Sequence, residues 1–296
     1  MSGCQRVVAG LCVGVVGMLL AAGAGAAAEA KVTRFARFQV EKKAVWGIVE
    51  GDRVRQIDAE PFRAWKPTDT TFPLAEVKLM VPTRPGCKVL ALAGNYKSHL
   101  GEKGAPANPE VFFKIPSCLI AQGEKIVIPP GTAQVDHEGE MVIVLGKRAR
   151  DVAPGKALDC VLGVTCGNDV SARDWQKNDV QWWRAKGSDT FGPCGPVIVS
   201  GIKYDDLQLT VRVNGEVRQQ QRTSDLIFGV AAIVSFISRH VTLEPGDLIF
   251  TGTPGTTTQL KPGDVVEVEL EGVGVLGNPV AARPERPKGA KKQAKP

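Results

Sequence analysis

Short apolar stretches of strand length recur along the chain, separated by turns rich in glycine and proline. Near the N-terminus they alternate apolar and polar positions, and a Glu-Gly-Asp turn divides two of them. This pattern predicts strands over residues 32–38, 44–49 and 53–57. Prolines and a glycine between residues 82 and 86 then mark a boundary, so we expect a small N-terminal β domain over residues 31–83.

The following residues, 86–280, are predicted to form one larger domain. Its apolar runs alternate less, which is typical of buried strands. They cover residues 88–93, 111–114, 126–128, 141–145, 161–166, 248–250 and 265–268. An Asn-Gly pair within residues 211–217 predicts a β-hairpin. The clearest helical spacing of apolar positions lies over residues 225–240, so the pattern favours a mainly β protein with some α structure (α+β).

Two glutamates lead directly into one of the buried runs. Glu138 and Glu140 are two positions apart, immediately before Met141–Leu145, so in a strand they point to the same face. Two like charges beside the core repel and are costly to desolvate, unless a proton or a cation lies between them. A solvated strand end with both side chains in water is the alternative. His137 points to the opposite face, and we do not assign it to this site.

Further polar residues follow other predicted strands. Asp169 comes just after the apolar run 161–166, where it is either a ligand or the N-cap of a helix over residues 171–177. Lys186 lies in an aromatic, glycine-rich loop. It is either a surface lysine or, beside carboxylates, an electrophile for an anionic substrate.

A histidine and a glutamate follow the strand predicted over residues 88–93. If residues 98–102 form a helical turn, His99 and Glu102 share a face and can hydrogen-bond. A carboxylate that holds one ring nitrogen leaves the other free to take a proton from water. An ordinary pair on a helix surface is the alternative. The loop over residues 103–109 is suited to act as a mobile lid.

The positive charge of the chain is concentrated outside the predicted domains. Of the formal net charge of +6, residues 281–296 carry +5 and residues 31–280 carry +1. The body therefore has no basic face with interleaved aromatic residues, and we expect no nucleic-acid partner. The tail is rich in proline, lysine and alanine, which predicts a disordered segment over residues 281–296.

The N-terminus has the pattern of a targeting segment. Arg6 is followed by an uncharged stretch over residues 7–28 that ends in small residues with A-x-A cleavage candidates. We predict a signal peptide over residues 1–28, with an uncleaved membrane anchor as the alternative. A signal peptide implies a periplasmic or secreted protein; without one the protein is expected in the cytoplasm. The five cysteines outside this segment contain no C-x-x-C pair and are predicted to be core fillers without disulfides, which suits a reducing compartment better.

Taken together, the motifs resemble the fumarylacetoacetate hydrolase family, over residues 32–280. The resemblance rests on a series of short motifs in a fixed order: Gly94-Asn95-Tyr96 with His99 and Glu102, His137-Glu138-Gly139-Glu140, Asn168 to Asp174, Lys186 to Pro193, Val213 to Glu216, Pro245 to Asp247, and Thr251 to Pro254. It implies a mixed β-sandwich roll with a small N-terminal β domain, usually a homodimer.

The resemblance also implies a chemistry and a set of roles. It assigns a divalent cation, Mg²⁺ or Mn²⁺, to Glu138, Glu140 and Asp169, whose hard oxygens suit such an ion. Catalytic roles fall to His99 as general base, Glu102 as the residue that orients it, and Lys186; substrate contacts fall to Tyr96, Arg173, Gln176 and Thr253.

The implied substrate is a 2-oxo or 1,3-diketo acid that reacts through a metal-stabilised enolate. Hydrolysis of a C–C bond, as in acylpyruvate cleavage, is the leading expectation. A decarboxylase of the oxaloacetate type and a 2-hydroxyhepta-2,4-diene-1,7-dioate isomerase use the same intermediate and stay open. So does an exported binding protein without turnover, which the extensions at both ends suggest.

Overall fold

The structure, a computed structural model, describes residues 1–3 and 31–284. The predicted signal peptide or anchor therefore lies outside the described residues, apart from residues 1–3, as does most of the predicted basic tail. The compact unit that begins at Lys31 contains every helix and strand described below. Among the described residues, no helix is both long enough and apolar enough to cross a membrane.

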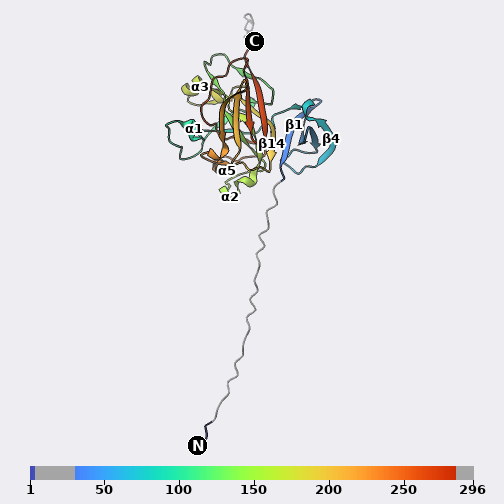
Figure 1. Cartoon of the computed structure of the whole chain (residues 1–296), viewed down its shortest axis with the longest axis vertical. Coiled ribbons are helices and arrows are strands. Elements are labelled where there is room, and N and C mark those ends of the chain that lie inside the picture. Colours follow the sequence, from blue (N-terminus) through green and yellow to red (C-terminus); the bar gives the residue numbers. More distant parts are fainter. Residues whose placement is uncertain (4–30, 285–296) are drawn as a thin grey trace, which may run out of the picture. The chain divides into compact units, whose positions relative to one another are not determined.

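A twelve-stranded mixed sheet contains both the N-terminal strands and most of the buried runs (Figure 1). The antiparallel pair β1 and β14 joins the two regions, through a register that sets Thr33 opposite Ser200. In spatial order the main strands are β4 (Pro67–Pro73), β3 (Arg53–Ile57), β2 (Lys43–Glu50), β1 (Thr33–Val40), β14 (Gly192–Ser200), β12 (Val161–Asn168), β11 (Gly139–Leu145), β17 (Leu248–Phe250), β6 (Val89–Ala93) and β7 (Glu110–Lys114). Two short strands, β5 (Lys78–Leu79) and β8 (Leu119–Ile120), pair with β1 and β14.

The remaining strands form a five-stranded sheet and a two-stranded ribbon. The five-stranded sheet runs β16 (Glu216–Arg222), β15 (Gln208–Val213), β18 (Val265–Leu270), β19 (Gly274–Ala282) and β9 (Ile126–Ile128), and the ribbon pairs β10 (Val135–Asp136) with β13 (Ser171–Ala172). The helices are short: α1 (Lys97–Leu100), α2 (Pro154–Ala157), α3 (Arg173–Asn178), α4 (Trp183–Gly187) and α5 (Val230–His240). Single 3₁₀ turns cover Leu74–Glu76, Pro116–Cys118, Leu158–Cys160 and Thr223–Asp225.

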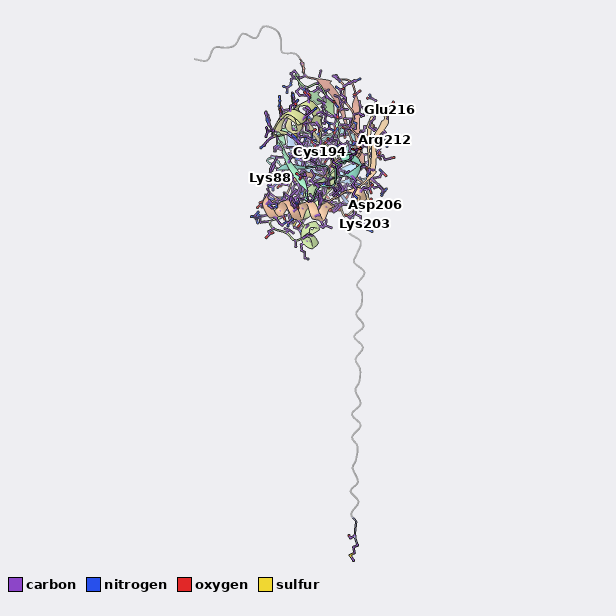
Figure 2. The ribbon with its side chains drawn as sticks, turned by 90° about the vertical axis from the view of Figure 1, so that its left-hand side faces the viewer. Lys88, Cys194, Lys203, Asp206, Arg212 and Glu216 are labelled. Atoms are coloured by element: carbon purple, nitrogen blue, oxygen red, sulfur yellow. The ribbon has the colours of Figure 1, made fainter. Side chains whose placement is uncertain are left out.

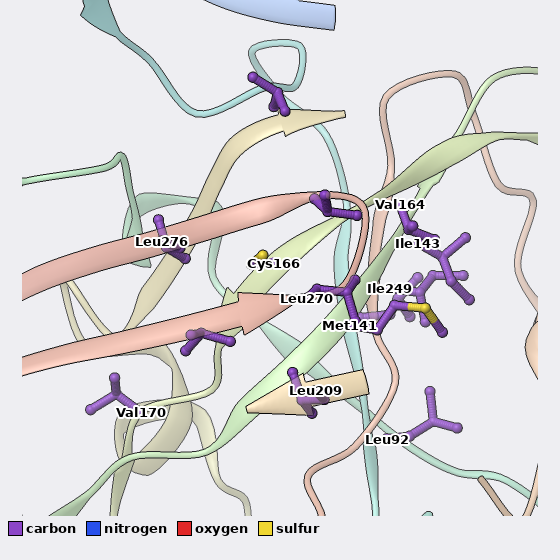
Figure 3. Packing of buried hydrophobic residues seen from close by; sticks show 14 of the residues in the cluster. Leu92, Met141, Ile143, Val164, Cys166, Val170, Leu209, Ile249, Leu270 and Leu276 are labelled. Carbon is purple, nitrogen blue, oxygen red and sulfur yellow. The ribbon is translucent and has the colours of Figure 1, made fainter. Parts of the chain in front are cut away.

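Strand β11 is buried on both faces, which explains why its apolar run is unbroken. Met141, Ile143 and Leu145 point into the main core, which also contains side chains of β15, β18 and β19 (Figure 3). The alternate residues, Val142 and Val144, point into a second cluster on the other face, with aromatic side chains of β1, β2 and β17. Two mixed sheets packed over a shared core confirm the predicted mainly β sandwich with some α structure.

The cysteines outside the N-terminal segment behave as the composition predicted. All five are buried and none forms a disulfide: Cys87, Cys118, Cys160, Cys166 and Cys194. Figure 2 shows Cys194 among the side chains of the interior, while the charged residues Lys203 and Asp206 are exposed at the surface.

The turn and helix predictions are confirmed with one adjustment. Asn214 and Gly215 both have positive φ, 54° and 82°, and connect β15 to β16 as the Asn-Gly signal predicted. The predicted helix over residues 225–240 begins only at Val230, because a 3₁₀ turn occupies Thr223–Asp225 and Gly229, with extended backbone, precedes the first helical residue.

Candidate metal centre

Three carboxylates converge where β11 begins and β12 ends. The strands are antiparallel, and their register sets Gly139 opposite Asn168, so the residue before β11 and the residue after β12 are neighbours. The backbone N–H of Asp169 donates to the carbonyl of Glu138 at 2.8 Å, which fixes this arrangement. One ligand oxygen from each of Glu138, Glu140 and Asp169 lies within 4.8 Å of the others. The predicted grouping is confirmed, and all three side chains are buried.

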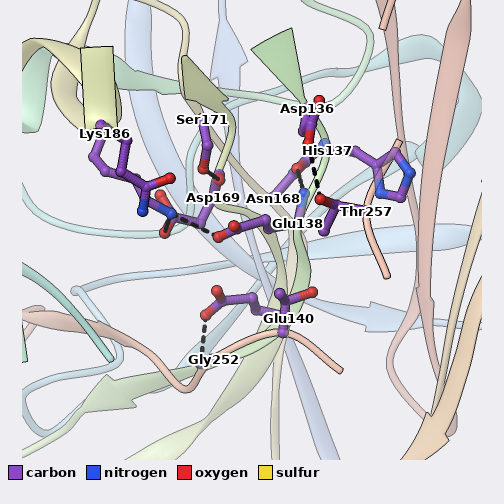
Figure 4. A network of polar contacts seen from close by, with 12 residues as sticks. Asp136, His137, Glu138, Glu140, Asn168, Asp169, Ser171, Lys186, Gly252 and Thr257 are labelled. Carbon is purple, nitrogen blue, oxygen red and sulfur yellow. Dashed lines mark hydrogen bonds and ion pairs between the residues drawn. The ribbon is translucent and has the colours of Figure 1, made fainter. Parts of the chain in front are cut away.

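Two buried lysines neutralise part of this charge. Lys186 lies on α4, and its Nζ is 2.6 Å from Glu138 Oε2 and 2.7 Å from Asp169 Oδ2 (Figure 4). It is therefore not a surface lysine. Lys114, the last residue of β7, donates to Asp169 Oδ1 at 2.6 Å and to the carbonyl of Phe191 at 3.1 Å. Asp169 is thus held by ion pairs, and the N-cap alternative is wrong, because α3 begins at Arg173 with Ala172 as its N-cap.

Arg173 links the carboxylates to a third acid. Its Nη1 lies 2.6 Å from Glu138 Oε1, and its Nε donates to Asp136 Oδ2 at 2.8 Å. Nη1 also donates to Gln176 Oε1 at 2.9 Å, one turn further along α3. Arg173 therefore contacts one carboxylate oxygen of Glu138 and Lys186 contacts the other.

The pKa values of Glu138 and Glu140 are shifted in opposite directions. Burial disfavours the charge of Glu138, but Lys186 and Arg173 outweigh it and lower the pKa of Glu138 to about 2. Burial, together with the neighbouring Asp169 and Glu138, raises the pKa of Glu140 well above its usual value. Glu140 Oε2 accepts the backbone N–H of Gly252 at 2.7 Å, whereas its Oε1 is buried without a hydrogen-bond partner.

A divalent cation fits this donor set. Unpartnered buried oxygens are costly, and hard carboxylate oxygens at this spacing are the ligands that Mg²⁺ and Mn²⁺ prefer. With Glu140 protonated, three ionised carboxylates balance three cations in the centre: Glu138, Asp169 and Asp136 against Lys114, Lys186 and Arg173. A cation that replaces the proton of Glu140 leaves the centre with one positive charge, which favours an anionic ligand.

Two adjoining cavities lie next to the carboxylate group, and Glu138 lines the inner one. The inner one, about 40 Å³, is lined by Glu138, Lys186 and Thr253 among others. The outer one measures about 510 Å³ and is lined by Arg173, Lys103 and Lys177 among others. The two cavities share five lining residues: Ala93, Gly94, His99, Gln176 and Trp182. A ligand at the carboxylates can therefore extend from the inner cavity into the outer one.

The predicted substrate contacts divide into two groups. Arg173, Gln176 and Thr253 line these cavities, as a substrate contact requires. Tyr96 lines neither. It is fully buried, its hydroxyl has no hydrogen-bond partner, and burial raises its pKa; its contact with a substrate stays a prediction.

The predicted pairing of His99 with Glu102 is not found. Helix α1 ends at Leu100, and Gly101 has a φ of 61°, so the turn that would have set the two residues on one face stops before Glu102. Glu102 is exposed. His99 Nδ1 lies 2.6 Å from the carbonyl of Gly255, which can only accept, so Nδ1 donates. The carbonyl of Gly255, instead of a carboxylate, orients the imidazole.

Two residues of the centre were missed from the sequence: Lys114 and Asp136. Lys114 ends an apolar run, a place where a lysine usually turns to solvent, yet it is fully buried. Asp136 lies two residues before Glu138, and its spacing within the Asp-x-Glu-x-Glu series was the available signal. His137, which we had left out of the site, bonds to Gln219 and Thr258 instead.

Comparison with known proteins places the chain in a family. Residues 88–281 match the family model described as fumarylacetoacetate (FAA) hydrolase C-terminal, and residues 33–82 match the model Rv2993c-like, N-terminal. Protein Rv2993c of Mycobacterium tuberculosis is 44% identical over 234 residues, which cover 77% of this chain and 88% of that protein.

Comparison with solved structures supports the same family. A 2-hydroxyhepta-2,4-diene-1,7-dioate isomerase from Mycobacterium marinum superposes with a TM-score of 0.80 at 40% identity, over 86% of this chain and all of that one. A maleylpyruvate hydrolase from Sphingobium sp. SYK-6, in complex with manganese(II) and pyruvate, gives a TM-score of 0.71 at 29% identity, over 85% of this chain and all of that one. The chain therefore belongs to the fumarylacetoacetate hydrolase family, and it is an enzyme of that family by fold and by site.

Proposed function

We propose that this protein binds Mg²⁺ or Mn²⁺ and uses it to shift a proton on a 2-oxo or 1,3-diketo acid, as an isomerase or tautomerase does. The observation that carries the proposal is the buried group of Glu138, Glu140 and Asp169, in which one oxygen of Glu140 has no hydrogen-bond partner and Glu138 lines a cavity. The manganese and pyruvate bound to the related maleylpyruvate hydrolase support the ligand class.

The cation would act as a Lewis acid that stabilises negative charge on the 2-oxo oxygen. The chain supplies the base and the remaining charge. Because Nδ1 of His99 donates to the carbonyl of Gly255, its Nε2 carries the lone pair, and His99 lines both cavities. We assign to it the removal of a proton from the carbon next to the oxo group. Lys186, with Nζ between two carboxylates, supplies positive charge as the oxyanion develops.

Proton transfer is favoured over hydrolysis by the place of Glu102. Hydrolysis needs a water held against the carbonyl carbon, and the expected orienting carboxylate is exposed and not bonded to His99. Hydrolysis of a C–C bond stays as the second candidate, because a related structure is a maleylpyruvate hydrolase and His99 is in place as a base.

One set of assays distinguishes an isomerase or tautomerase from a hydrolase. The purified protein with Mg²⁺ is incubated in D₂O with oxaloacetate, a hydroxydienedioate or an acylpyruvate. Proton NMR then follows deuterium exchange beside the oxo group, and chromatography follows cleavage products. Exchange or isomerisation without cleavage supports the proposal, and cleavage supports hydrolysis. Exchange that persists in EDTA or in Glu140→Gln would refute the role of the metal, and binding without any turnover would make the chain a binding protein.

A further inference from the structure

The loop that follows β17, residues 251–258, is bonded to two of the functional side chains. The backbone N–H of Gly252 donates to Glu140 Oε2 at 2.7 Å, and the carbonyl of Gly255 accepts from His99 Nδ1 at 2.6 Å. Thr253 lies between these two glycines in the chain and lines the inner cavity. The position of this loop therefore determines how both the carboxylate of Glu140 and the imidazole of His99 are held.

A buried glutamine from the five-stranded sheet holds the loop. Gln219 belongs to β16, which lies at the edge of that sheet, yet its exposed fraction is only 4%. Its Nε2 donates to Thr253 Oγ1 at 2.9 Å and to the carbonyl of Pro254. Its Oε1 lies 3.2 Å from the backbone N of Gly139 and 3.2 Å from His137 Nδ1. The amide thus has two donor and two acceptor contacts, which uses its full capacity.

The chemistry of the partners fixes the orientation of this amide. The N–H of Gly139 can only donate and the carbonyl of Pro254 can only accept, so Oε1 faces the first and Nε2 the second. The imidazole of His137 is consistent with this orientation, because the backbone N–H of Thr258 donates to its Nε2 at 3.3 Å. Nδ1 of His137 therefore has the proton and donates it to Gln219 Oε1.

Three hydrogen bonds close a ring between the loop, β16 and the start of β11. The N–H of Gly139 donates to Gln219, Gln219 donates to the hydroxyl of Thr253, and this hydroxyl donates to the carbonyl of Gly139 at 2.9 Å. Gly139 is the residue between Glu138 and Glu140, and a Cβ on it would lie 2.1 Å from a side chain of β15. The β15–β16 hairpin therefore packs directly against the strand of the two glutamates, and the ring holds the loop in register with them.

We propose that Gln219 is a positioning residue, which holds the loop against the strand of the two glutamates and so keeps the imidazole of His99 in one place and in one tautomer. The inference rests on the proposed function, which makes His99 the base. Gln219 lines neither of the two cavities, so it acts on a ligand only through the loop and the carbonyl of Gly255.

Nitrogen-15 NMR of the imidazoles tests this in EDTA, without turnover. The chain has three histidines, His99, His137 and His240, and a glutamine variant of each assigns its signals. At about pH 8.5, where an unperturbed imidazole is neutral, wild-type His99 should be the Nδ1–H tautomer. In Gln219→Met the carbonyl of Gly255 is no longer held in place, so His99 should become a mixture of both tautomers.

A kinetic measurement accompanies the spectra. With Mg²⁺, Gln219→Met should lower kcat for deuterium exchange about tenfold to a hundredfold, with a smaller change in KM, because a displaced base affects the reaction more than binding. If this variant does not fold by circular dichroism, Gln219→Asn is measured in its place. Its side chain is one methylene shorter, so its amide cannot bond to both Gly139 and the loop, and the same loss is expected.

Gln220→Met is the matched control, because it replaces the same residue type at the next position of β16, where the side chain is exposed. It should keep the wild-type tautomer of His99 and the wild-type kcat. The inference is overturned if wild-type His99 is not the Nδ1–H tautomer, if the variants at Gln219 keep the wild-type signals of His99, or if Gln220→Met changes them as well. A wild-type protein that exchanges no deuterium would instead refute the proposed function, and the spectra would still decide whether Gln219 holds His99.

Discussion

Replacement of Glu138 by glutamine directly tests the electrostatic balance of the candidate metal centre. Its carboxylate lies 2.6 Å from Lys186 Nζ and 2.6 Å from Arg173 Nη1, and it is buried. Glutamine keeps the shape of the side chain and removes the charge, so both cations lose a largely buried counter-ion. In the metal-free protein we expect a large loss of stability.

The magnitude follows from the acidity of Glu138. Burial opposes ionisation, but Lys186 and Arg173 lower its pKa to about 2 from the reference value of 4.5. Each pKa unit corresponds to about 1.4 kcal/mol, so the folded state favours the ionised form by about 3 kcal/mol. Because the folded pKa is the lower one, this stability is complete above pH 4.5 and is lost as the pH falls toward 2. The cost of Glu138→Gln should therefore be about 3 kcal/mol at pH 7 and about 1 kcal/mol at pH 3.

Urea unfolding in EDTA, followed by circular dichroism at both pH values, measures this cost. Glu76→Gln, at an exposed position in the 3₁₀ turn Leu74–Glu76, is the matched control and should change the free energy of unfolding by less than about 0.5 kcal/mol. A cost below about 1 kcal/mol at pH 7, or one that does not change between pH 7 and pH 3, would refute the reasoning.

Four further outcomes are expected. Glu140→Gln should abolish Mg²⁺ binding in calorimetry yet raise the melting temperature in EDTA, because burial raises the pKa of this carboxyl and an amide suits the metal-free site. Lys114→Met breaks a buried ion pair and should cost about 3 kcal/mol in urea unfolding. Burial raises the pKa of Cys118 to about 11 and of Cys166 to about 12, so mass spectrometry should find both unlabelled by iodoacetamide until urea is added. N-terminal sequencing of the mature protein should find cleavage within residues 24–28 if the signal peptide operates; an intact Met1 on exported protein would indicate an anchor.

The sequence predicts those parts of the site that depend on strands. Glu138 and Glu140 precede an unbroken apolar run, and Asp169 follows another, so their grouping needs only the pairing of two buried strands. The sequence does not predict correctly the part of the site that depends on the conformation of a single residue. The pairing of His99 with Glu102 assumed that the helical turn continues to Glu102, two residues beyond its actual end at Leu100, and Gly101 ends the helix with a positive φ.

Lys114 shows a second limit of what the sequence predicts about the site. Its partners Asp169 and Phe191 lie 55 and 77 residues away in the chain. The periodicity of a strand predicts to which face a side chain points, but not which other elements pack against that face. In the sequence, a buried lysine at the end of a strand therefore cannot be distinguished from an exposed one. Lys186 was ambiguous for the same reason, and the structure shows it buried beside the carboxylates, while its role as an electrophile stays a prediction.

The pairing of β1 with β14 has a consequence for any shortened form of the protein. β1 supplies the backbone partners of Ile198, Val199 and Ser200. A chain that begins after residue 83 would leave that stretch of β14 as an open sheet edge, beside two fully buried apolar side chains, Ile198 and Val199, that would then meet solvent. Unprotected edges of this kind recruit strands from other molecules. We therefore expect residues 84–284 expressed alone to self-associate through β14.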